Sequence, residues 1–216
     1  MANLLALETS TDICSVSLSR GEEIFNFHQL MPKQHTENLF GIISGLFEES
    51  GLSFEKLDGV AVAVGPGSYT GVRLACSVAQ GIAFSHDIKA VTLSSLELLS
   101  IEAHRNLGLE RINCISAANQ GKVYVAESSF VDGDILTKMK LIDQESILRE
   151  SFPENSHFIG EGCELLQFEN QLRDGQPRAS LLLEVAKVRF SKGNCIEAES
   201  ILPIYFNDEN SWKKII

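Results

Sequence analysis

The chain has 216 residues, 44 % of them hydrophobic, which is enough to build a sizeable core in one large domain or two smaller ones. Its 29 Asp and Glu residues outnumber its 18 Lys and Arg residues and give a formal net charge of −11, which argues against direct binding of nucleic acid. Five widely spaced cysteines form no Cys-x-x-Cys pair, so they indicate neither a disulfide framework nor a zinc knuckle.

The start of the chain, MANLLALETS, has no charged leader, and its apolar run is too short for a signal peptide. No stretch approaches the ~20 consecutive apolar residues that a membrane-spanning helix needs. The sequence therefore predicts a cytoplasmic protein that does not bind membranes.

The first half of the chain predicts a three-strand meander followed by alternating helices and strands. Its predicted strands occupy residues 4–9, 14–19, 23–29, 59–64 and 89–93. Its predicted helices occupy residues 37–50, about 70–85 and about 94–104. Thr36 is the expected N-terminal cap of the first helix, and Gly51 is its expected C-terminal cap.

The second half repeats this order of elements without repeating the sequence. Its predicted strands occupy residues 111–117, 121–130, 135–142 and 156–160, and its predicted helices occupy about 144–150, 161–172 and 179–191. The repeat predicts an α/β fold of two lobes similar to the actin-like (ASKHA) superfold, each lobe a mixed sheet with a three-strand meander and flanking helices. We place the N-terminal lobe at residues 1–104 and a smaller C-terminal lobe at 105–216, and expect the tail 203–216 to return to the first lobe.

The residues show no motif for metal or nucleophilic catalysis. The five His residues are never three or four positions apart, so no helix carries two of them on one face. Ser68 is no nucleophile elbow, because Pro66 and Thr70 stand where that motif needs glycines. No Lys-Ser or Lys-Thr pair follows the glycines, which excludes a Walker loop. We therefore interpret Ser68 and Thr70 as helix caps, and expect no catalytic and no metal-binding residue.

Two turns of the first half resemble parts of a nucleotide site. An acid followed by hydroxyls joins the first two strands, and a glycine-rich turn follows the fourth. The candidate residues for a weak nucleotide contact are Glu8, Thr9, Ser10, Gly65 and Gly67. Actin-like ATPases hold phosphate and magnesium with such an acid–hydroxyl turn, but they usually include a glycine, which residues 8–13 lack. Weak ATP binding and a purely structural hairpin are therefore both open.

Two predicted helices carry small residues at helical spacing. Gly71, Ala75 and Ala79 follow one another at intervals of four residues, and Gly41 and Gly45 do the same in the first helix. A glycine inside a helix costs ~1 kcal/mol relative to alanine, so the pattern needs a reason. The alternatives are tight packing of the helix on its own sheet and close approach of helices from two chains.

Four stretches of the chain together resemble the bacterial TsaB (YeaZ) family. They are ALETSTDICSVSL, HTENL, GPGSYTGVRLACSVAQGIA and PIYFNDENSWKK. The resemblance implies a two-lobed actin-like fold without the catalytic metal site of the paralogue TsaD. It implies a non-catalytic subunit that binds and activates TsaD and acts with the ATPase TsaE. Together these proteins attach a threonylcarbamoyl group to adenosine 37 of tRNAs that read ANN codons.

The resemblance also implies partners and a binding surface. Family members contact TsaD through their N-terminal helices, form homodimers when alone, and meet tRNA only through the complex. The expected partner-binding residues are Gly41, Gly45, Thr70, Gly71, Arg73, Ala75 and Ala79. No resident cofactor is expected, and a site for ATP or ADP at the junction with the partner is left open. The alternative function is a stand-alone enzyme, either a peptidase of the M22 type, a label that the wider family carries, or a weak ATPase.

Two places depart from the family pattern. Ala117-Ala118-Asn119 stands where many members have Asp-Ala-Arg, and Asn207 stands where the usual pattern has Arg. Both changes remove charged groups, so no role of those groups is carried over to the second lobe.

Overall fold

The computed structural model describes residues 2–118, 120–131, 134–147, 152, 156–164, 171–172, 175–206 and 213–214. The chain forms two compact units: residues 1–95 with 177–204, and residues 96–176 with 205–216. This division differs from the predicted boundary near residue 104. The segment that rejoins the first unit is 177–204, whereas the tail after it belongs to the second.

The first unit is built on a five-stranded mixed sheet in the order β3-β2-β1-β4-β5. Its strands are β1 (Leu4–Glu8), β2 (Ile13–Arg20), β3 (Glu23–Leu30), β4 (Gly59–Ala63) and β5 (Lys89–Leu93). β1 to β3 pair antiparallel, and β1, β4 and β5 run parallel. Every residue of β1 and β4 is buried, as expected for central strands that are covered on both faces.

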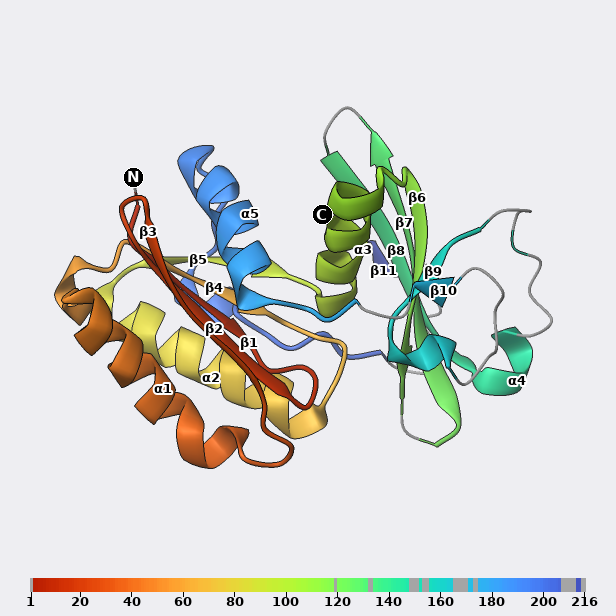
Figure 1. Cartoon of the computed structure of the whole chain (residues 1–216), viewed down its shortest axis with the longest axis horizontal. Helices are drawn as coiled ribbons and strands as arrows, with labels where there is room; N and C mark the ends of the chain where they lie inside the picture. The colour runs from red at the N-terminus through yellow and green to blue at the C-terminus, as the bar shows by residue number, and fades with distance from the viewer. Residues whose placement is uncertain are drawn as a thin grey trace. The chain divides into compact units, whose positions relative to one another are not determined.

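Helices from distant parts of the chain cover the two faces of this sheet (Figure 1). The helices α1 (His35–Ser50) and α2 (Tyr69–His86) lie on one face, and α5 (Ala179–Ser191) lies on the other. The first 95 residues supply helices for one face only, so the return of 177–204 covers the second face. Beyond α5, Ile196 pairs with Ala90 at the β5 edge, next to the short helix η3 (Ala198–Ser200).

The second unit repeats the strand order of the first. Its elements are α3 (Ser95–Leu107), β6 (Arg111–Ala117), β7 (Lys122–Val131), β8 (Asp134–Asp143), α4 (Gln144–Ile147), β9 (Phe158–Ile159), η2 (Glu161–Cys163), β10 (Gln171–Leu172) and β11 (Lys213–Lys214). The sheet order β10-β9-β6-β7-β8-β11 contains the same arrangement of a meander with parallel strands beside its first strand. The predicted fold class, two mixed sheets with a three-strand meander each, is confirmed.

Some local expectations were met and others were not. Gly51 ends α1 in the left-handed conformation with φ 65°, as predicted, but α1 begins at His35, so Thr36 lies inside the helix and is not its cap. The predicted helix at 161–172 is wrong in its described parts, which form η2 and β10. Asn119 and Asn207 lie outside the described residues. Within the described ranges, no helix is long and apolar enough to span a bilayer.

Candidate partner-binding surface

The glycine-rich turn before α2 lies against the turn between β1 and β2. The Ser68 backbone N–H donates to the Ser10 carbonyl oxygen at 2.6 Å, and the Thr9 hydroxyl donates to the Gly71 carbonyl oxygen at 2.7 Å. A Cβ atom at Gly71 would overlap the Thr9 carbonyl oxygen, and one at Gly67 would overlap the Ser10 carbonyl oxygen. The glycines are therefore required because backbone of the same chain comes this close.

Glu8 is buried beneath these turns. Its Oε1 accepts a hydrogen bond from the Ser10 backbone N–H at 2.9 Å, and its Oε2 has no hydrogen-bond partner among the described residues. Burial raises the pKa of Glu8 to about 7, and interactions with Ser10 and Ser95 offset only part of that effect. Such a carboxyl group binds its proton close to neutral pH.

The five residues predicted for a nucleotide contact are thus brought together, but they face one another. Glu8 and Thr9 have 0 % exposure and Ser10 has 3 %, and the two turns are joined by direct hydrogen bonds. This geometry favours the structural hairpin, and a nucleotide contact stays a prediction. Ser68 has the predicted capping role, since its hydroxyl accepts a hydrogen bond from the Gly71 N–H at 3.3 Å.

The small residues of α2 point into the core of the first unit. Gly71 is buried, and Ala75 and Ala79 have 0 % exposure in a cluster with residues of the sheet, such as Leu7 and Val62. Contrary to the prediction, these three residues do not lie on the surface. Their small size lets α2 approach its own sheet closely, which is the internal-packing alternative.

The other predicted interface residues lie on the outward faces of α1 and α2. Gly41 and Gly45 are exposed, and a Cβ atom at either would meet nothing within 4 Å. Thr70 is exposed, and Arg73 is half-buried with its guanidinium 3.2 Å from the centre of the Tyr69 ring. These positions leave the two helices open to a neighbour.

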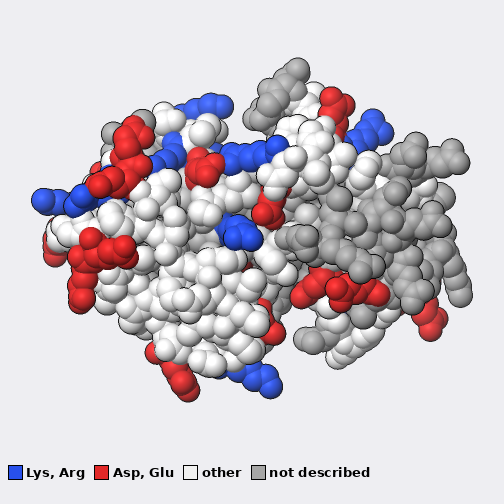
Figure 2. Space-filling view, viewed as in Figure 1, with Lys and Arg blue, Asp and Glu red and all other residues white. Residues whose placement is uncertain are grey.

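Charged side chains are scarce on α2 and in the middle of α1, whose exposed glutamates Glu37, Glu48 and Glu49 lie at its two ends. Arg73 is the one Lys, Arg, Asp or Glu among the 18 residues of α2. Figure 2 shows a broad uncharged area over α1 and α2, with acidic side chains at its margin. A smooth, uncharged helical surface of this kind is typical of a site that packs against another protein.

The family model described as "TsaD: tRNA N6-adenosine threonylcarbamoyltransferase" matches residues 29–158, more than half of the chain. The chain belongs to this family. The matched range includes α1 and α2 and therefore the surface described above.

The chain is similar over nearly its whole length to TsaB proteins, which confirms the resemblance predicted from the sequence motifs. It is 29 % identical to the tRNA threonylcarbamoyladenosine biosynthesis protein TsaB of Haemophilus influenzae, over 98 % of this chain and 96 % of that protein. The TsaB protein of Escherichia coli is 28 % identical over 98 % and 97 %. The solved structure of YeaZ from Pseudomonas aeruginosa is similar with a TM-score of 0.84 and 29 % identity, covering 95 % of this chain and 100 % of that one.

Similarity to the TsaD transferases themselves is more limited. A tRNA N6-adenosine threonylcarbamoyltransferase of Bradyrhizobium diazoefficiens is 32 % identical over 97 residues, which is 27 % of that protein. Among the described residues, no three His, Cys, Asp or Glu side chains lie close enough together to hold a metal ion.

Sequence reasoning missed part of the surface that this member of the TsaD family presents. Four further outward residues lie on α1 and α2: Phe40, Ser77, Gly81 and Phe84. Phe84 is 77 % exposed and Phe40 is 62 % exposed. Helical spacing could have identified these residues, because it separates α2 into two faces. One face holds Thr70, Ser77, Gly81 and Phe84, and the opposite face holds Gly71, Ala75 and Ala79.

Proposed function

We propose that this chain is a non-catalytic partner subunit that binds and activates a TsaD-type transferase in the biosynthesis of threonylcarbamoyladenosine in tRNA. The proposal rests on the names of relatives that match nearly the whole chain. The observation that carries it is the outward face of α1 and α2, whose middle part has the exposed glycines Gly41 and Gly45 and the exposed aromatic residues Phe40 and Phe84, with glutamates only at the ends of α1.

The described residues favour a binding role over catalysis. Burial raises the pKa of the Cys76, Cys114 and Cys163 thiols to about 12 and that of Cys14 to about 11, so these thiols do not form nucleophilic thiolates near neutral pH. The Ser68 hydroxyl caps α2. A peptidase that uses one of these thiols or Ser68 as its nucleophile therefore has less support than a binding subunit.

The charge of the chain favours a tRNA contact through other subunits. A net charge of −11 repels the phosphate backbone, so we propose that tRNA is bound through the TsaD-type partner. The ATPase TsaE is proposed as the third component. A homodimer through the α1 and α2 face is proposed for the chain alone, because the same uncharged surface would be left uncovered.

Reconstitution of the modification reaction tests this proposal. The cognate TsaD-type protein and TsaE are incubated with unmodified tRNA and the precursors, with and without this chain, and the modified nucleoside is measured by mass spectrometry. We expect product only when the chain is present, and no ATP or peptide hydrolysis by the chain alone. Equal product without the chain, or turnover by the isolated chain, would overturn the proposal.

A further inference from the structure

A pocket of about 410 Å³ opens at the C-terminal end of α1, entirely within the first unit. It lies between the last turns of α1 and the short helix η1 (Phe54–Lys56). Its lining residues are Ser44, Phe47, Glu48, Gly51, Leu52, Ser53 and Phe54.

The lining contains a closely packed apolar part. The rings of Phe47 and Phe54 stack with their centroids 3.9 Å apart and their planes inclined by 15°. Phe47 is 5 % exposed and Leu52 is 7 % exposed, so both are held in the core rather than free to collapse into the pocket. Phe54 is half-buried, so its ring is the accessible aromatic part of the lining and can contact the apolar stem of a neighbouring side chain.

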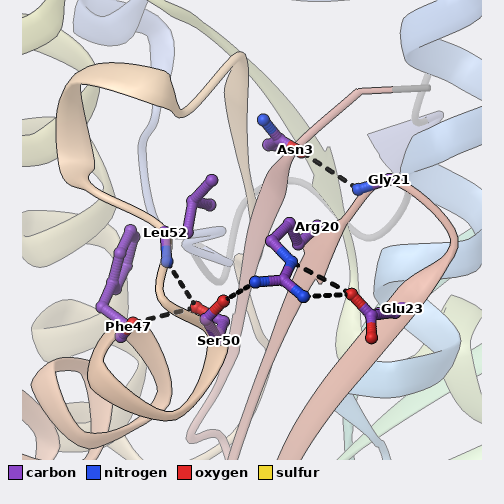
Figure 3. Close-up of polar contacts among 7 residues, drawn as sticks. All are labelled: Asn3, Arg20, Gly21, Glu23, Phe47, Ser50 and Leu52. Carbon is purple, nitrogen blue, oxygen red and sulfur yellow. Dashed lines mark hydrogen bonds and ion pairs between the residues drawn. The ribbon is translucent and has the colours of Figure 1, made fainter.

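Hydrogen bonds fix the residues of this apolar part (Figure 3). The buried Ser50 hydroxyl donates to the Phe47 carbonyl oxygen at 3.0 Å and accepts from the Leu52 N–H at 3.2 Å. The Arg20 guanidinium in turn donates to the Ser50 carbonyl oxygen and forms an ion pair with Glu23. The pocket is therefore already formed in the chain alone.

The rim of the pocket carries an exposed carboxylate. Glu48 lines it, is exposed, and has no ion-pair partner among the described residues. Glu49 and Glu55 are exposed nearby in the sequence, and the last turn of α1 contains no basic residue. The C-terminal end of a helix adds partial negative charge. The basic neighbours are Arg20, whose guanidinium binds the Ser50 carbonyl oxygen and is ion-paired with Glu23, Lys56 at the end of η1, and His86, whose ring centroid lies 6.1 Å from that of Phe54.

Figure 2 shows acidic side chains at the edge of the first unit over the C-terminal end of α1, with basic side chains beside them. An apolar aromatic wall with an unpaired carboxylate at its rim matches a side chain with an apolar stem and a cationic head. Arginine fits better than lysine, because its planar guanidinium stacks on aromatic rings and binds a carboxylate through two N–H groups.

We propose that this pocket receives an arginine side chain of the protein that docks on α1 and α2. Glu48 follows Gly41, Ser44 and Gly45 along the exposed face of α1, so the pocket is continuous with the partner-binding surface. The inference rests on the proposed function and adds a residue that determines partner specificity. The carboxylate of Glu48 binds the guanidinium, and the half-buried ring of Phe54 contacts its stem.

Binding of the cognate TsaD-type protein, measured by titration calorimetry, tests this assignment. Glu48→Gln keeps the size of the side chain and removes its charge, and Glu49→Gln removes the same charge one residue outside the pocket. We expect Glu48→Gln to weaken binding about tenfold, as for the loss of a charge-assisted hydrogen bond at an interface. The Glu49→Gln variant should bind as the wild type does, and added salt should reduce the difference between the two variants.

The outcomes separate the two claims. If the wild-type chain binds and the two variants have equal affinities, whether unchanged or weakened, the role assigned to the pocket is overturned. The proposed function is then left standing. Failure of the wild-type chain to bind the TsaD-type protein would overturn the proposed function and the assigned occupant with it. Circular dichroism spectra and melting temperatures that match the wild type establish that both variants are folded.

Discussion

Replacing Glu8 with glutamine should stabilise the folded chain at pH 8 and change its stability little at pH 4.5. Glu8 is fully buried, and its pKa rises from the ordinary value of 4.5 to about 7. The folded chain therefore holds this proton more tightly than the unfolded chain does. Between these two pKa values the unfolded state loses the proton while the folded state keeps it, so stability falls as the pH rises.

The size of the effect follows from the two pKa values. Each pH unit across this interval is worth about 1.36 kcal/mol, so the charged form of Glu8 costs about 3 kcal/mol above pH 7 relative to pH 4.5. Glutamine has the same shape and no charge, and its own Oε1 can still accept the Ser10 N–H. The Glu8→Gln variant should therefore not lose this stability when the pH rises from 4.5 to 8.

Urea unfolding followed by circular dichroism at several pH values measures this difference. The quantity to compare is the free energy of unfolding of the variant minus that of the wild type, because other groups titrate equally in both. Glu49→Gln, at an exposed position, corrects for the general effect of removing one negative charge. A difference that does not change between pH 4.5 and 8, or one that grows toward acid pH, would refute the reasoning.

Two further substitutions test the packing of the first unit. Gly71→Ala should destabilise the chain by about 1–3 kcal/mol, because its Cβ atom would overlap the Thr9 carbonyl oxygen; an unchanged urea midpoint would contradict this close approach. Arg20→Ala should destabilise by about 1 kcal/mol, because it removes the hydrogen bond to the Ser50 carbonyl oxygen and the ion pair with Glu23. Thermal unfolding at low and high salt checks the second prediction, and a melting temperature equal to that of the wild type would show that Arg20 does not support the end of α1.

The sequence predicts most elements of the first unit because their patterns are local. Alternating residues identify the strands of the meander, and the predicted helix at 179–191 has the bounds of α5. The sheet on which that helix packs is not determined by its local sequence. Its apolar face fits any uncovered sheet, so the sequence pattern alone did not place 177–204 in the first unit.

The candidate surface was predicted in its helices but not in their orientation. A repeat of small residues such as Gly71, Ala75 and Ala79 permits close packing and does not specify whether the neighbour is a strand of the same chain or another protein. The neighbouring apolar positions Val72 and Cys76 indicate the buried face, because a helix on a sheet buries one continuous stripe. The raised pKa of Glu8 depends on burial by residues far away in the chain, so no local pattern predicts it.

The central claim is that the outward face of α1 and α2 binds a TsaD-type protein. Gly45→Arg places a long charged side chain on that face, where a Cβ atom has open space, so the fold should be preserved. Ser191→Arg adds the same charge at the exposed end of α5, on the opposite face of the sheet.

Titration calorimetry of both variants against the cognate TsaD-type protein is the most direct measurement. The account predicts that Gly45→Arg abolishes binding while Ser191→Arg binds as the wild type does. Wild-type affinity in the Gly45→Arg variant would contradict it.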